Sequence, residues 1–303
     1  MIPFVPGRAR AVFAGGAAVL ALALASPPSH GQAWLPDKGA GSISFDYTDV
    51  LNKKHYNPVG TEVDVGHTDI QIFSIGGSYS LSDRIQLSAS LPFVNTRHRG
   101  PGGGGHNTEI DNGHWHGTAT DLQLTLHYQL ADGAIGFAPY IGIVLPTSSY
   151  VTFGHAAPGR GLEEYWVGFF AARSLNDWIP RTYVQLRGNY AFVEKVQDVS
   201  HDRSNASLEI GYFVNESVSV RALVTRQWTH GGIDVPVPLT SPLFPDHDRL
   251  AAEELTNVGG GVSWNLNGRI SLYGLYIRSI DGSNAHKVDH RFSFGMSYGT
   301  GGH

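Results

Sequence analysis

Cysteine is absent from this 303-residue chain. Without thiols the chain can form no disulfide, no thiolate metal site and no cysteine nucleophile. Charge is also sparse, because Asp, Glu, Lys and Arg together make up 16 % of the residues and the net charge is −5. Nucleic-acid-binding proteins need a basic surface to meet phosphates, and this composition supplies none. Nucleic acid is therefore excluded as a partner.

Long apolar runs are missing beyond the N-terminus. Residues 11–25 form an apolar stretch that follows two arginines, which is the pattern of a secretory signal peptide. A bilayer-spanning helix needs roughly 20 apolar residues, so this stretch is too short for an anchor. A small residue, Ala33, stands where signal peptidase would cut. We predict a cleaved signal peptide over residues 1–33 and a single secreted domain over residues 34–303.

Apolar and polar residues alternate repeatedly along the rest of the chain. In residues 121–130 every second residue is apolar and the residues between are polar, which is the pattern of a β-strand with one face buried or in lipid. Twelve segments show this pattern in a strong or weak form: 41–50, 68–81, 84–93, 121–130, 137–145, 164–175, 182–192, 207–214, 217–228, 255–266, 269–280 and 291–298.

The links between these segments alternate in length. The short links are 81–84, 131–133, 176–181, 215–217 and 265–268. The long links are 51–67, 97–117, 146–163, 195–205, 230–254 and 281–289. Short periplasmic turns and long extracellular loops are typical of outer-membrane barrels, whose closed sheet leaves no backbone polar group unpaired in lipid.

The sequence therefore predicts an all-β protein, an antiparallel transmembrane β-barrel of about twelve strands in the outer membrane of a Gram-negative cell. Its expected partners are outer-membrane lipid and, during biogenesis, the barrel-assembly machinery. The alternative is a secreted β-sandwich that binds a ligand, in which the apolar strand faces meet a second sheet.

The polar faces of the strands would face the lumen of such a barrel. The lumen-lining candidates are Gln71, Gln86, Asp121, Gln123, Gln185, Arg187, Glu209 and Arg221. Charges inside a narrow barrel must be paired or hydrated, so these side chains would either fill the lumen with salt bridges or line a polar conduit. In residues 269–280 the apolar positions change parity, which predicts a bulge.

The fifteen histidines are many for this length. Three of them, His106, His114 and His116, lie in the glycine-rich link 97–117 and are weak candidates for binding Zn²⁺, Cu²⁺ or Ni²⁺. Four consecutive glycines make ordering of this link costly in entropy. The favoured interpretation is therefore a polar surface loop without a metal. No other cofactor is indicated. No nucleophile with its base stands in a diagnostic local motif, so we expect no enzymatic activity.

Two short motifs carry a family resemblance. Residues 74–94, SIGGSYSLSDRIQLSASLPFV, resemble the strand–turn–strand of the outer-membrane transporters grouped as the "MetA-pathway of phenol degradation" family. Residues 145–148 are similar to a "lPTG" step of that family, with serine in place of glycine. The resemblance implies a channel or transporter for small hydrophobic or aromatic solutes and no catalytic residues. The alternative is a non-conducting barrel with a structural or binding role.

Overall fold

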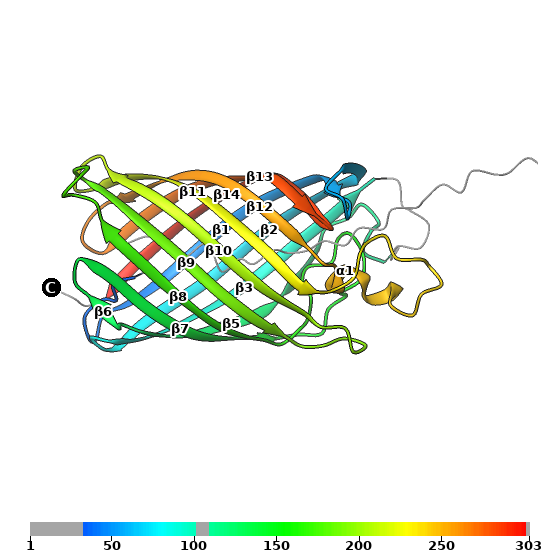
Figure 1. The fold of residues 1–303 in the computed structure, drawn as a ribbon, viewed down its shortest axis with the longest axis horizontal. Coiled ribbons are helices and arrows are strands. Elements are labelled where there is room, and N and C mark those ends of the chain that lie inside the picture. Colours follow the sequence, from blue (N-terminus) through cyan, green and yellow to red (C-terminus); the bar gives the residue numbers. More distant parts are fainter. Residues whose placement is uncertain (1–32, 101–108, 301–303) are drawn as a thin grey trace, which may run out of the picture.

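A closed antiparallel β-barrel makes up nearly all of the computed structural model, which describes residues 33–100 and 109–300 (Figure 1). Twelve strands form the wall over these two ranges. They are β1 (Gly41–Tyr56), β2 (Glu62–Ser82), β3 (Ile85–Arg99), β4 with β5 (His116–Ala119 and Asp121–Tyr128), β7 (Ile135–Pro146), β8 (Glu164–Ser174), β9 (Thr182–Val193), β10 (His201–Phe213), β11 (Val218–Gly231), β12 (Glu254–Asn265), β13 (Ile270–Ser283) and β14 (Ala285–Thr300).

Strand pairing confirms the predicted barrel and rules out the sandwich. Each wall strand pairs with its neighbour in the sequence, and β1 pairs with both β2 and β14, which closes the ring. β4 and β5 both pair with β3 and count as one wall strand, whereas the two-residue β6 (Ala131–Asp132) belongs to a turn. No helix in the described ranges is long and apolar enough to cross a membrane. The short α1 (His247–Leu250) lies between β11 and β12.

The five short links are confirmed as turns, but two of the predicted long links are wrong. Within 51–67, β1 continues to Tyr56 and β2 begins at Glu62, so most of the link is strand. Within 281–289, only Asn284 separates β13 from β14. Polar residues can continue a ladder here because strand ends that extend beyond the bilayer meet water on their outer face. The predicted signal peptide lies outside the described residues apart from Ala33.

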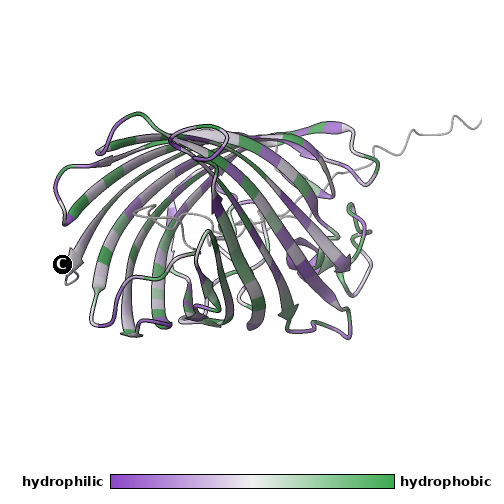
Figure 2. Cartoon of the chain, turned by 60° about the vertical axis from the view of Figure 1, so that its left-hand side comes forward, coloured by the Kyte–Doolittle hydropathy of each residue, from purple (hydrophilic) through white to green (hydrophobic). Residues whose placement is uncertain are grey.

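The two faces of the wall differ in polarity. On β10, the outward Leu208 and Ile210 are 47 % and 49 % exposed, and Leu208 pairs directly with the outward Val224 of β11. Hydrophobic and hydrophilic residues alternate along the strands (Figure 2). A continuous apolar outer face is what lipid requires of a spanning barrel.

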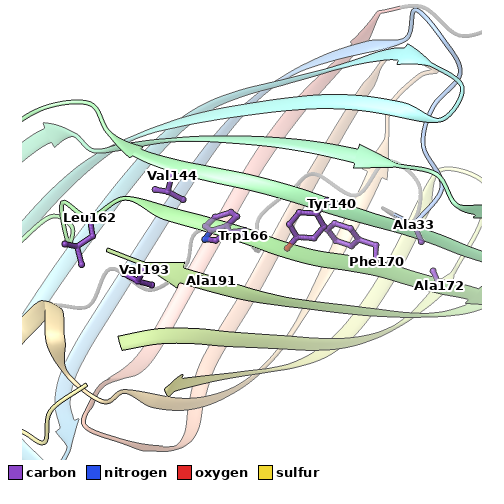
Figure 3. Packing of buried hydrophobic residues seen from close by; sticks show 9 residues of the cluster. All are labelled: Ala33, Tyr140, Val144, Leu162, Trp166, Phe170, Ala172, Ala191 and Val193. Carbon is purple, nitrogen blue, oxygen red and sulfur yellow. The ribbon is translucent and has the colours of Figure 1, made fainter. Parts of the chain in front are cut away.

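Part of the inward face is apolar as well. Side chains of β7, β8 and β9 pack together on the inside, and Figure 3 shows Tyr140 beside Phe170 in this group. On β13, Leu275 and Ile277 are buried inward, which explains the change of parity in the sequence. The ladder between β12 and β13 also shifts register beside Ile280, where a bulge was predicted.

Three inward tyrosines lie directly opposite glycines. Tyr183 pairs with Gly211, and Tyr273 pairs with Gly295. A Cβ placed on Gly211 would come within 2.2 Å of the Tyr183 ring. Tyr140 covers Gly168 on the next strand in the same way. Each glycine therefore provides the space in which a tyrosine ring lies flat across the neighbouring strand.

Gly211→Val is therefore expected to displace the Tyr183 ring and to lower the free energy of unfolding by about 1–3 kcal/mol, the usual cost of overpacking. Urea unfolding in lipid vesicles measures this change. Gly274→Val is the matched control, because Gly274 lies on the outward face and a Cβ there meets Phe294 only at 3.7 Å. Equal stability of the two variants would show that the ring does not need this space.

Candidate functional site in the barrel interior

Seven of the eight predicted lumen residues lie on the inward face. Directly paired residues in a ladder point to the same side of the sheet. Glu209 pairs with Gln185, and Arg221 pairs with Gly211, on the side opposite to exposed Ile210. The seven are Gln86, Asp121, Gln123, Gln185, Arg187, Glu209 and Arg221.

Gln71 lies instead on the outer face, contrary to expectation. It pairs with Asn95 and shares its face with Phe73, which is 52 % exposed. The inward residues beside it are apolar, since Ile70 and Ile72 are 2 % and 3 % exposed. Near the extracellular end the outer wall leaves the lipid, so polarity no longer identifies the inward face.

Acidic groups bound by tyrosines lie at two places in the interior. The Tyr183 hydroxyl donates to Glu209 at 2.7 Å, and the Arg221 Nε lies 3.7 Å from the same carboxylate. The Tyr273 hydroxyl donates to Asp46 at 2.6 Å, reaching from β13 past β14 to β1. The two groups meet where the guanidinium carbon of Arg221 lies 5.9 Å from the centre of the Tyr273 ring. Side chains of five strands thus form a polar belt along part of the inner wall, made of Tyr183, Glu209, Arg221, Tyr273 and Asp46.

Arg187 lies in aromatic surroundings. Its guanidinium carbon is 5.0 Å from the centre of the Phe170 ring and 5.7 Å from that of Tyr140, and its Nη2 donates to the Tyr140 hydroxyl at 3.3 Å. His127 stacks on Tyr140 with ring centres 5.1 Å apart. A cation held against aromatic faces is attracted by their quadrupoles, so this patch combines charge with apolar surface.

Arg291 of β14 is an inward cation that the sequence analysis missed. It is 9 % exposed, and its Nε and Nη2 have no hydrogen-bond partner among the described residues. A signal was present, because Phe292 and Phe294 alternate with it and point outward. The parity of segment 291–298 was enough to place Arg291 inside.

Two buried ion pairs lie nearer the extracellular end, and neither was predicted. Arg203 of β10 binds Glu164 of β8, and their side chains are 6 % and 11 % exposed. Arg160 binds Glu253 through side chains that are 8 % and 2 % exposed. The Trp166 indole also donates to Glu164 at 2.9 Å. The first pair joins two wall strands, and the second joins two of the connections between strands.

The loop between β7 and β8, residues 147–163, reaches across the barrel. The Tyr150 hydroxyl donates to inward Asp121 at 2.6 Å, and the Thr96 hydroxyl of β3 donates to the Ala156 carbonyl. His155 lies against His286 of β14, with ring centres 6.4 Å apart. β7 and β8 are fifth and sixth in the ring, whereas β14 is twelfth, so the loop reaches almost the opposite wall. We call residues 147–163 the crossing loop.

Asp111 holds the middle of the crossing loop. Its carboxylate accepts hydrogen bonds from the backbone N–H of His155 at 3.0 Å and of Ala156 at 2.8 Å. Burial and, to a smaller extent, the nearby carboxylate of Asp248 raise the pKa of Asp111 to about 6, although the two backbone hydrogen bonds lower it. At neutral pH the group is still mostly ionised and accepts both bonds.

Of the three histidines proposed from sequence as weak metal ligands, the structure describes His114 and His116. His106 lies outside the described residues. His116 contacts Asn112 Oδ1 at 2.9 Å in an exposed position, and His114 is exposed beside it. Neither belongs to the group of histidines that the structure does bring together.

Known structures share the architecture. The COG4313 outer membrane channel from Pseudomonas putida F1 superposes with a TM-score of 0.70, at 17 % identity over 89 % of this chain and 99 % of that one. The NanC porin gives 0.50, at 10 % identity over 84 % and 98 %. No protein-family model and no curated protein sequence matches the chain. At these identities the likeness concerns the fold, and the fold is that of an outer-membrane β-barrel.

Proposed function

We propose that the protein is an outer-membrane channel for small solutes. The observation that carries the proposal is the row of charged groups on the inward face of three neighbouring strands, at Arg187, Glu209 and Arg221. Charged side chains around a pore give it selectivity. The two similar structures are named as a channel and a porin, which supports the same function.

Hydrophobic or aromatic solutes are the proposed class. Arg187 against Phe170 and Tyr140 offers a face for an aromatic ring and a charge for an attached carboxylate. The family resemblance of residues 74–94 supports the same class. A twelve-stranded barrel has a narrow lumen, so a solute would pass close to this patch.

The proposed route to the membrane begins with the signal peptide of residues 1–33, cleaved near Ala33, and continues through the barrel-assembly machinery. N-terminal sequencing of the protein purified from outer membranes tests the cleavage. A mature chain that keeps residues 11–25 would contradict it.

A non-conducting binding or structural barrel remains the second candidate. The crossing loop favours it, because residues of that loop pair with buried groups such as Glu253 and reach the far wall. In that case the interior ion pairs would serve stability alone.

Uptake by whole cells distinguishes the two candidates. A deletion strain is complemented with wild type, Arg187→Gln or Arg278→Gln, and uptake of labelled benzoate, toluene and succinate is measured. Arg278 lies on the exposed outer face and controls for loss of a positive charge. We expect wild type to restore uptake of the aromatic probes, Arg187→Gln to slow benzoate most, and Arg278→Gln to match wild type. Uptake that the protein leaves unchanged for every probe would favour the non-conducting barrel.

A further inference from the structure

Three histidines from distant parts of the chain meet at the extracellular end of the interior. His55 stands near the end of β1, His286 near the start of β14, and His155 in the middle of the crossing loop. Each offers a ring nitrogen, and these three atoms all lie within 4.8 Å of one another. The residues are 7 %, 3 % and 2 % exposed in that order.

The two wall histidines face each other without a separating side chain. His55 and His286 are a direct pair in the ladder, and their ring centres are 3.6 Å apart. Neither ring nitrogen of His286 has a hydrogen-bond partner among the described residues. Buried polar atoms without partners cost free energy, and a bound cation would satisfy one of them.

His155 is held in place from three sides. Asp111 accepts its backbone N–H, and Thr96 donates to the carbonyl of the next residue, Ala156. The His98 ring stacks on it with ring centres 4.2 Å apart, while His98 itself contacts the Thr68 hydroxyl at 3.0 Å. Supporting contacts of this kind orient the ligands of a metal site before the ion arrives.

We propose that His55, His155 and His286 bind a divalent first-row transition-metal ion such as Zn²⁺. Imidazole nitrogen suits Zn²⁺, Cu²⁺ and Ni²⁺, whereas Ca²⁺ and Mg²⁺ require oxygen ligands, which this set lacks. Zinc–nitrogen bonds of about 2.0–2.1 Å place tetrahedral ligands roughly 3.3–3.4 Å apart, so the ring nitrogens, now within 4.8 Å of one another, would move closer by at most about 1.5 Å. A water molecule would complete the coordination.

The consequence concerns the crossing loop. His155 belongs to the loop, whereas the other two ligands belong to strands on the far wall. A bound ion would therefore fasten the loop to that wall in a way that depends on metal concentration. This role is independent of the proposed transport of solutes and of which solutes pass.

Zinc titration of the purified protein tests the site. The barrel, without a histidine tag, is treated with chelator in detergent and titrated calorimetrically with Zn²⁺, and Co²⁺ is used to observe tetrahedral absorption in the visible range. The variant is His155→Ala, which changes the loop and leaves the wall strands intact. The matched control is His114→Ala/His116→Ala, which removes two histidines outside the group.

We expect wild type and control to bind one Zn²⁺ equally. His155→Ala should bind at least about 10–100-fold more weakly, since loss of even a supporting residue has that effect. Zn²⁺ should also protect residues 147–163 from protease in wild type and in the control, but not in His155→Ala. If His155→Ala fails to fold, His55→Gln replaces it. Equal binding by wild type and the ligand variant, loss of binding in the control, or no binding by wild type would each overturn the proposal.

Discussion

Ile210→Arg is expected to impair assembly of the barrel, whereas Glu209→Gln, one residue earlier, is expected to assemble normally. Ile210 lies in the outward apolar row of β10 and is 49 % exposed. Arginine at the middle of a lipid-facing row costs about 2–4 kcal/mol. Glu209 faces inward, where Gln can still accept the hydrogen bond from Tyr183. The two substitutions thus test opposite faces of one strand.

Heat-modifiable migration after refolding into lipid vesicles measures the folded fraction of each variant. An unboiled, folded barrel migrates differently from the boiled, unfolded chain, so the fraction of each state can be quantified from one gel. If Ile210→Arg assembled and Glu209→Gln did not, the inward and outward faces assigned to β10 and to the strands paired with it would have to be exchanged.

Arg203→Met is expected to lower the free energy of unfolding by about 3–5 kcal/mol, because it leaves Glu164 buried without its partner. Both residues belong to wall strands and cannot move out to water. The double variant Arg203→Met/Glu164→Leu should lose less than the sum of the two single variants, since it removes both charges. Urea unfolding in vesicles gives all three values.

Arg226→Met is the matched control for the buried pair. Arg226 binds Glu254 on the outer face at 3.0 Å, with side chains 38 % and 42 % exposed, so its loss should cost no more than about 1 kcal/mol. If Arg203→Met and Arg226→Met lowered the free energy of unfolding by similar amounts, burial would not increase the contribution of the inner pair to stability.

Strand number and the inward side of most strands could be predicted from the sequence, because lipid forces a two-residue repeat along each strand. Segments 207–214 and 217–228 illustrate this, with Glu209 and Arg221 both inward as the repeat requires. The rule failed at Gln71, where β2 extends past the lipid and the apolar residues lie inside. A pattern imposed by lipid carries no information about a strand above the membrane.

The interior beyond the strands could be predicted far less. The two-residue repeat along segment 291–298 could have placed Arg291 inside the barrel, but it says nothing about His155, which lies in a loop. Its neighbours are His55, 100 residues earlier, and His286, 131 residues later, and only the path of a long loop brings the three together. Loop paths depend on pairs such as Arg160 with Glu253, which leave no periodic trace in a sequence.

The crossing loop also has a mechanical consequence for the barrel. Changing the circumference of a closed sheet breaks ladder hydrogen bonds, but flattening its circular section into an ellipse only bends the sheet. A tie between nearly opposite strands, such as the one from β7 and β8 to β14, resists that flattening at the extracellular rim. Release of the loop would therefore soften one rim of the cylinder and leave the stiffness of the other unchanged.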